Sequence, residues 1–262
     1  MKLGIVGEAT QLRFRSILPH MVRIGARGLQ MSAVGEFAPK SLGETARRDI
    51  RNLLKSHEAH LTALNCPLQR GIDDEFQLQP RLEAIRDTMV LACELQSNVV
   101  LVPLPQIPVA DEKGERPRVL RESLDFLGST GDRLGCLVAM EIGFDPIPSV
   151  VEYLQQFSFG SLQVNYDPAN MIFHRHEPLK DLVLLKDRLC HFHARDARKV
   201  SVSEGTQEVA LGAGDVSWLA MIATLSAIEY RGWIVQRRTP GPNRMQDFEA
   251  GIQFLRKMTI SS

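Results

Sequence analysis

Short apolar segments recur along this chain at a spacing that leaves room for one helix after each of them. The eight segments are Lys2–Gly7, Gly28–Val34, Leu61–Pro67, Asn98–Leu104, Leu137–Gly143, Leu162–Asp167, Cys190–Asp196 and Trp233–Arg237, and successive segments begin 25 to 43 residues apart. A short apolar run bounded by turn residues is typical of a buried strand. Eight alternations of strand and helix predict an α/β fold, a single (β/α)8 barrel.

Helix signals occupy several of the gaps. Pro80 suits a first helical turn, and apolar residues follow it at helical spacing through Leu95. Pro178 is expected to begin another helix, with Leu182, Leu185 and Leu189 on one face.

The main alternative architecture is an open, doubly wound sheet. A glycine-rich phosphate turn after the first strand would favour it, but Gly7-Glu8-Ala9-Thr10 contains no GxGxxG motif. We therefore expect one TIM-barrel domain over residues 1–262, with its active site at the C-terminal ends of the strands.

The charge balance and the cysteine pattern argue against several classes of partner. Lys plus Arg and Asp plus Glu both number 31, so no net charge attracts the chain to nucleic acid or to a membrane surface. The four cysteines form no CxxC pair, which is typical of reduced thiols in a cytosolic protein. No apolar run approaches the ~20 residues of a membrane helix, and the N-terminus does not look like a signal peptide. We expect a cytoplasmic protein without a nucleic-acid or membrane partner.

Polar residues stand at the ends of four late strands. In Asn165-Tyr166-Asp167-Pro168, strand alternation stops at a proline that cannot extend a ladder. The same alternation predicts that Glu141, His193 and Gln236 point inward at a similar depth to Asp167. Ligands meet parallel α/β proteins at these strand ends. Two carboxylates, an imidazole and an amide oxygen would suit Mn²⁺, Mg²⁺, Co²⁺ or Zn²⁺.

Each of these four residues also has a purely structural interpretation. Asp167 could form an Asp-Pro turn, and Glu141 could be a buried carboxylate paired with a basic residue. His193 could be a core histidine whose hydrogen bonds are satisfied, and Gln236 could bind only its neighbours. Their coincidence at matched strand ends favours a functional site.

Further polar residues are expected at the same rim of the barrel. The residues assigned to substrate binding are Glu8, Asn65, Asn165, His174, Arg195 and Arg238. The basic residues Arg195, Arg198, Lys199, Arg237 and Arg238 would favour an anionic sugar, with some of them exposed at the surface. The glycine-rich segment Leu211–Asp215 leads into a helix, and its amides could hold a phosphate or hydroxyl group.

Four stretches in the second half of the chain resemble a known family. They are Met140-Glu141-Ile142-Gly143, Asn165-Tyr166-Asp167-Pro168-Ala169-Asn170, His191-Phe192-His193-Ala194-Arg195-Asp196 and Leu211-Gly212-Ala213-Gly214-Asp215-Val216-Ser217-Trp218. In this order they resemble the xylose isomerase-like TIM barrels, the sugar phosphate isomerase/epimerase superfamily that also includes endonuclease IV-type enzymes. The first half matches only in general layout.

The resemblance implies a metal site and a reaction. The carboxylates matching Glu141 and Asp167, the imidazole matching His193 and a glutamate after the eighth strand would hold a divalent metal. This chain has Gln236 at the last position, which lowers the negative charge and removes a base. The metal would stabilise an enediolate while a carboxylate moves the proton next to the carbonyl.

With Gln236 as an amide, Glu141 remains as the catalytic carboxylate. One base suits same-face aldose–ketose isomerisation better than epimerisation. The predicted function is a divalent-metal-dependent isomerase or epimerase that acts on a small sugar or sugar phosphate. Barrels of this kind often pair, so a homodimer is a further expectation.

Two other functions remain open. A barrel that binds a sugar-like ligand without turnover would account for the missing glutamate at Gln236. A metal-dependent apurinic endonuclease would need a histidine-rich site with several metal ions. Against it, the third strand ends Leu64-Asn65-Cys66-Pro67, and Asn170 rather than histidine stands three residues after Asp167.

Overall fold

The computed structural model describes residues 1–109, 112–201, 204–239 and 244–260, and within them eight parallel strands close into a barrel. The barrel order is β1-β10-β7-β6-β5-β4-β3-β2. These strands are β1 (Lys2–Val6), β2 (Gly28–Ser32), β3 (His60–Asn65), β4 (Val99–Pro103), β5 (Leu137–Glu141), β6 (Leu162–Tyr166), β7 (Leu189–Ala194) and β10 (Trp233–Gln236). Each corresponds to one predicted segment, so the predicted (β/α)8 barrel is confirmed.

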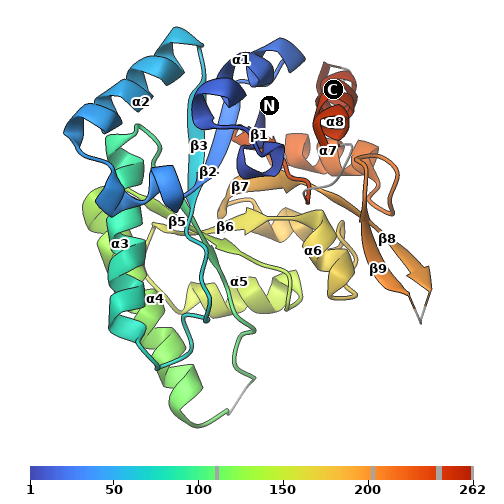
Figure 1. The fold of residues 1–262 in the computed structure, drawn as a ribbon. Helices are drawn as coiled ribbons and strands as arrows, with labels where there is room; N and C mark the ends of the chain where they lie inside the picture. Colours follow the sequence, from blue (N-terminus) through green and yellow to red (C-terminus); the bar gives the residue numbers. More distant parts are fainter. Residues whose placement is uncertain (110–111, 202–203, 240–243, 261–262) are drawn as a thin grey trace.

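Helices follow the barrel strands and surround them (Figure 1). The α-helices are α1 (Phe14–Ile24), α2 (Glu44–Ser56), α3 (Leu78–Glu94), α4 (Glu115–Leu134), α5 (Ile147–Gln155), α6 (Pro168–Phe173), α7 (Trp218–Ala227) and α8 (Arg244–Ile260). Short 3-10 turns form at η1 (Glu8–Thr10), η2 (Gly35–Phe37), η3 (Pro39–Ser41) and η4 (Leu182–Leu185). None of the helices in the described ranges is long and apolar enough to cross a lipid bilayer.

The helix that follows β6 begins at Pro168, ten residues before the expected start at Pro178. Asp167 is the N-cap of α6, and its Oδ1 accepts hydrogen bonds from the amides of Ala169 (3.0 Å) and Asn170 (3.2 Å). Pro168 occupies the first helical position, where its fixed φ angle and missing N–H are tolerated. The prediction of an α-helix after Pro178 is wrong, because the apolar residues there form the single 3-10 turn η4 and then enter β7.

A two-stranded antiparallel sheet lies between β7 and α7. Its strands are β8 (Asp196–Ser201) and β9 (Gly205–Val209), and Figure 1 shows this hairpin projecting from the barrel. The hairpin packs beside α6. It therefore stands next to the C-terminal end of the barrel, where β6 and β7 finish.

The interior of the barrel has an apolar part and a polar part. Ala63, Val99, Leu101 and Ala139 form a buried apolar cluster that is separate from the larger core between strands and helices. Toward the strand ends, polar side chains replace them, and Asn165 and Asp167 are completely buried. Buried polar groups need hydrogen-bond partners, so this half of the interior must form an ordered network.

Candidate active site

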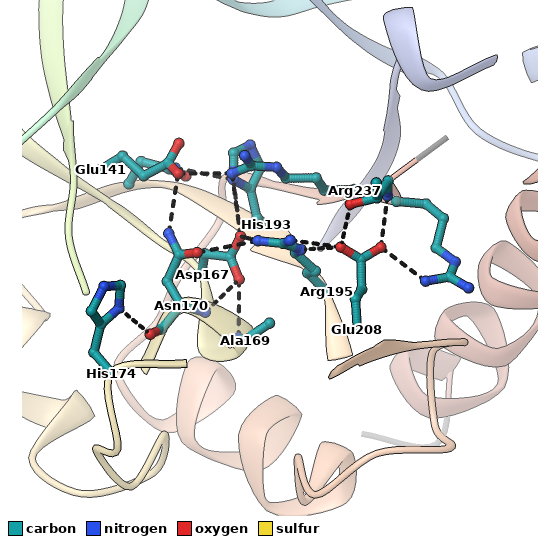
Figure 2. Close-up of polar contacts among 12 residues, drawn as sticks. Glu141, Asp167, Ala169, Asn170, His174, His193, Arg195, Glu208 and Arg237 are labelled. Carbon is teal, nitrogen blue, oxygen red and sulfur yellow. Dashed lines mark hydrogen bonds and ion pairs between the residues drawn. The ribbon is translucent and has the colours of Figure 1, made fainter. Parts of the chain in front are cut away.

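Glu141, Asp167 and His193 converge at the ends of β5, β6 and β7 (Figure 2). The Nδ1 atom of His193 lies 3.7 Å from Oδ2 of Asp167. Asn170, in the first turn of α6, links the two carboxylates, since its Nδ2 donates to Oε1 of Glu141 at 3.1 Å while its main-chain N–H donates to Asp167. The structure thus brings three of the four predicted strand-end residues together.

Gln236 does not join them. Its Nε2 donates to the main-chain carbonyl of Asp247 in α8 at 2.9 Å, so the side chain points to the helix layer. A Cβ atom added at Gly251 of α8 would stand 2.1 Å from that Nε2 atom, which shows how closely the helix covers it. The expectation that Gln236 shares the inward face is wrong by one residue.

Arg237 takes the inward position instead. Val235 pairs with His193 across β10 and β7, so the residue two positions further along faces the same side. Nη1 of Arg237 lies 2.8 Å from Oε1 of Glu141, 3.4 Å from Oδ2 of Asp167 and 3.5 Å from Nδ1 of His193. Figure 2 shows the guanidinium reaching across to these three side chains.

The arginines control the charge of both carboxylates. Burial alone would raise the pKa of Asp167, but the neighbouring His193 imidazole and the charges of Arg195 and Arg237 lower it to about 2. Burial likewise opposes ionisation of Glu141, yet the charge of Arg237, followed by that of His193, lowers its pKa. Both groups are therefore carboxylates at neutral pH.

The two histidines of β7 belong to a hydrogen-bonded chain across the barrel. Nε2 of His193 contacts Oε1 of Gln30 at 2.7 Å, and its Nδ1 contacts Nδ2 of Asn165 at 3.2 Å. The Asn165 amide also contacts Nδ1 of His191 through its oxygen at 2.8 Å. The pKa of His191 is lowered well below its usual value by burial and then by His193, so His191 is neutral. Asn165, which we expected to bind substrate, instead holds both rings.

The residues present do not fit a divalent metal ion. A guanidinium, which proteins do not deprotonate, stands where Glu141, Asp167 and His193 converge. A metal held by these side chains at about 2.0–2.2 Å would meet that fixed positive charge. Within the described ranges, no three His, Cys, Asp or Glu residues are grouped to hold a metal ion.

Glu208 of β9 pairs with two of the basic residues that were expected to attract an anionic sugar, Arg195 and Arg238. Its carboxylate pairs with Nη2 of Arg195 at 2.6 Å and with Nη1 of Arg238 at 2.9 Å. Arg195 also donates to Oδ1 of Asn170 at 3.2 Å, and Arg238 pairs with Asp247 at 2.9 Å. Both arginines are thus engaged by the chain's own carboxylates.

The other predicted rim residues, Glu8, Asn65 and His174, have hydrogen-bond partners other than Glu141, Asp167, His193 and Arg237. Glu8 accepts a hydrogen bond from the amide of Ser32, and Nδ2 of Asn65 donates to Oγ of the same serine at 3.3 Å. Burial raises the pKa of Glu8, and its Oε2 is buried without a hydrogen-bond partner among the described residues. His174, just after α6, bonds the carbonyl of Asn170 at 2.8 Å and packs on Phe144.

The glycine-rich loop does not present its amides to a ligand. The buried carboxylate of Asp196 accepts hydrogen bonds from the main-chain amides of Gly212 (2.9 Å), Gly214 (3.2 Å) and Val216 (3.3 Å). It also accepts from Nε1 of Trp218 at 2.9 Å. The amides that we considered for a phosphate are thus used internally.

The sequence interpretation missed the role of three residues of the site. Asn170 was considered only as the absence of a histidine, Glu208 lies on a hairpin with no clear strand pattern, and Arg237 was named only among the basic residues for an anionic sugar while Gln236 was placed on the inward face. A signal existed for Arg237: shifting the alternation of the eighth strand by one residue would have turned it inward. Nothing local marked Glu208, because its partners lie elsewhere in the sequence.

A closed parallel barrel defines the fold as a TIM barrel, and the polar cluster at its C-terminal rim is the candidate functional site. A family model described as "Xylose isomerase-like TIM barrel" matches residues 19–258. The chain belongs to this family. No curated protein matches the sequence.

Solved structures share the fold at low sequence identity. A xylose isomerase domain protein from Planctomyces limnophilus has a TM-score of 0.82 at 20% identity, covering 92% of this chain and 90% of that one. A probable 3-DHS dehydratase from Bacillus anthracis has a TM-score of 0.80 at 17% identity, covering 98% and 99%. A 3-keto-D-glucoside 4-epimerase from E. coli has a TM-score of 0.76 at 17% identity, also covering 98% and 99%.

Proposed function

We propose that this protein is an isomerase that moves a proton next to the carbonyl of a small sugar or sugar phosphate. The observation that carries the proposal is the 2.8 Å ion pair between Glu141 and Arg237 at the mouth of the barrel. Their side chains are 18% and 33% exposed, so a ligand can reach both. A base beside a fixed cation is the pair that enediolate chemistry requires.

Glu141 is the proton-transfer group. Its Oε1 is held by Arg237 and Asn170, whereas no group among the described residues donates a hydrogen bond to Oε2. That second oxygen can take the proton from the carbon next to the carbonyl and return it to the neighbouring carbon. A second proton moves from the neighbouring hydroxyl group of the substrate to its carbonyl oxygen. The aldose and the ketose therefore contain the same atoms.

Arg237 supplies the positive charge for the substrate oxygen. Within the described residues, only its Nη1 has side-chain partners, and Nε and Nη2 have none. These donors can face the oxygen that becomes negative in the enediolate. Asp167 is completely buried and caps α6, so its role is to position Arg237 and not to contact the substrate.

Family membership and an epimerase among the similar structures support carbohydrate chemistry in general. The choice of isomerisation rests on Glu141, which is 18% exposed, whereas Asp167, the other carboxylate paired with Arg237 among the described residues, is completely buried. The cytoplasmic location, the homodimer and the lack of a nucleic-acid partner stay predictions.

Deuterium exchange tests the reaction. Aldoses and ketoses, free and phosphorylated, are incubated with the protein in D₂O and followed by proton NMR. We expect deuterium at the carbon next to the carbonyl of at least one sugar, and Glu141→Gln should slow this exchange by about 10²- to 10⁴-fold, the usual contribution of a general base. Glu152→Gln, an exposed change on α5, is the matched control. Full exchange in Glu141→Gln would contradict the assignment.

The second candidate is a barrel that binds such a ligand without turnover. The lowered pKa of Glu141 favours it, because a carboxylate paired with Arg237 is a weak base. Saturation-transfer NMR with the same sugars separates the two functions. Binding without deuterium exchange in the whole panel would support the binder.

A further inference from the structure

We propose that the guanidinium of Arg237 occupies the place of a metal ion and supplies its positive charge to Glu141 and Asp167. The single change Arg237→Glu would then turn this site into a divalent-metal site. The inference rests on the proposed function only in placing the substrate beside Glu141 and Arg237, at the C-terminal end of the barrel. Its test measures metal binding and needs no turnover.

The backbone fixes Arg237 in the central position. Its main-chain N–H donates to the carbonyl of Ala194 at 3.0 Å, which extends the β10–β7 ladder one residue beyond β10. The side chain must therefore follow the inward face that Val235 and His193 already define. Any residue at position 237 projects toward Glu141 and Asp167.

The charges of the cluster need one cation, and Arg237 supplies it. Asp167 is completely buried, and Arg237 at 3.4 Å is its nearest full positive charge, with Arg195 at 3.8 Å. Burial would lower the pKa of Arg237, but the carboxylates of Glu141 and Asp167 raise it. A divalent ion could enter only by displacing this guanidinium and breaking both ion pairs, which is unfavourable in a buried site.

The other side chains around the guanidinium are two carboxylates and one imidazole. His193 bonds Gln30 through Nε2, and its Nδ1 faces Asp167 and Arg237 while also contacting Nδ2 of Asn165 at 3.2 Å. A partner on one ring nitrogen is what orients a ligating histidine. With a carboxylate at position 237, three carboxylates and one imidazole nitrogen would converge there, a donor set that suits Mn²⁺ or Zn²⁺.

Mn²⁺ titration of the purified protein tests the proposal, followed by calorimetry and by the paramagnetic resonance signal of free Mn²⁺. We expect no stoichiometric binding to the wild-type protein at submillimolar Mn²⁺ and one Mn²⁺ per chain in Arg237→Glu, with affinity at least about 100-fold higher. Gln236→Glu is the matched control, because this neighbouring side chain faces α8 and should gain no site.

Two further measurements guard against a variant that does not fold. Mn²⁺ should raise the melting temperature of Arg237→Glu and leave that of the wild-type protein unchanged. Arg237→Gln, which removes the positive charge without adding a carboxylate, should bind Mn²⁺ more weakly than Arg237→Glu but more tightly than wild type.

The proposal is overturned if wild-type protein binds one Mn²⁺ that Glu141→Gln abolishes. It is equally overturned if folded Arg237→Glu binds no more Mn²⁺ than Gln236→Glu. Neither outcome depends on deuterium exchange. The proposed reaction and the proposal that Arg237 takes the place of a metal ion can therefore fail separately.

Discussion

At the scale of single residues, Asp167 combines a backbone role with an electrostatic one. One carboxylate oxygen caps α6, and the other faces His193, Arg195 and Arg237. A fully buried carboxylate is stable only with such partners. The same side chain therefore fixes where α6 begins and where the guanidinium of Arg237 lies.

This role predicts a pH dependence. The pKa of Asp167 is about 2 in the folded protein, below its ordinary value of 3.8, so the carboxylate stabilises the fold above pH 4. That stabilisation, about 2 kcal/mol, is lost as the pH falls from about 4 to about 2. We expect Asp167→Asn to lower the free energy of unfolding at pH 7 and to lose most of this deficit near pH 2. Urea titrations followed by circular dichroism at both pH values measure it, and a deficit that does not change with pH would contradict the assignment.

At the scale of elements, one carboxylate organises the connection from β7 to α7. Asp196 stands at the start of β8 and holds the amides of the glycine-rich loop together with the indole of Trp218. The hairpin that follows brings Glu208 against Arg195 and Arg238. A connection that departs from the simple barrel plan therefore builds one wall of the site.

Replacing Asp196 should weaken this connection strongly. Asp196→Asn keeps the size of the side chain but turns an NH₂ group toward main-chain donors, leaving at least one buried donor without an acceptor. We expect a loss of about 2–4 kcal/mol in the free energy of unfolding. Denaturant titration at pH 7 measures the loss, with the exposed Asp187→Asn as the control. Equal stability of the two variants would show that the hydrogen bonds of Asp196 contribute little.

At the scale of the whole molecule, the interior of the barrel separates stability from function. The apolar cluster around Leu101 fills one part of the interior, and the polar residues at the strand ends form the candidate site. In barrels of this kind the filled interior supports the strands, while the C-terminal rim is free to vary. Changes in the apolar cluster should thus alter stability without altering the chemistry of the rim.

Leu101→Ala tests that separation. Leu101 is fully buried, and the cavity left by its side chain should lower the free energy of unfolding by about 2–5 kcal/mol. Leu219→Ala, at a site that is 71% exposed, should change it little. The affinity of folded Leu101→Ala for a sugar that the wild-type protein binds, measured by calorimetry, should stay close to the wild-type value. A large loss of affinity without a loss of stability would contradict the separation.

The local pattern of the sequence determined the barrel strands and the positions of three rim residues. Apolar runs at regular spacing predict strands because each barrel strand must be buried. Glu141, Asp167 and His193 follow from the same reasoning, since strand alternation places each of them on the inward face near the C-terminal end of such a strand. The helix after Pro178 failed because leucine spacing alone does not distinguish an α-helix from a 3-10 turn that leads into a strand.

Only the tertiary structure decided which of Gln236 and Arg237 enters the site. Trp233, Ile234 and Val235 are all apolar, because a barrel strand is covered on both faces, and an uninterrupted apolar run carries no information about direction. The pairing of Val235 with His193 settles that direction. The partners of Asp196 and Glu208 are likewise set by contacts between distant segments. Whether this rim holds a metal ion or an arginine therefore depends on the register of one short strand.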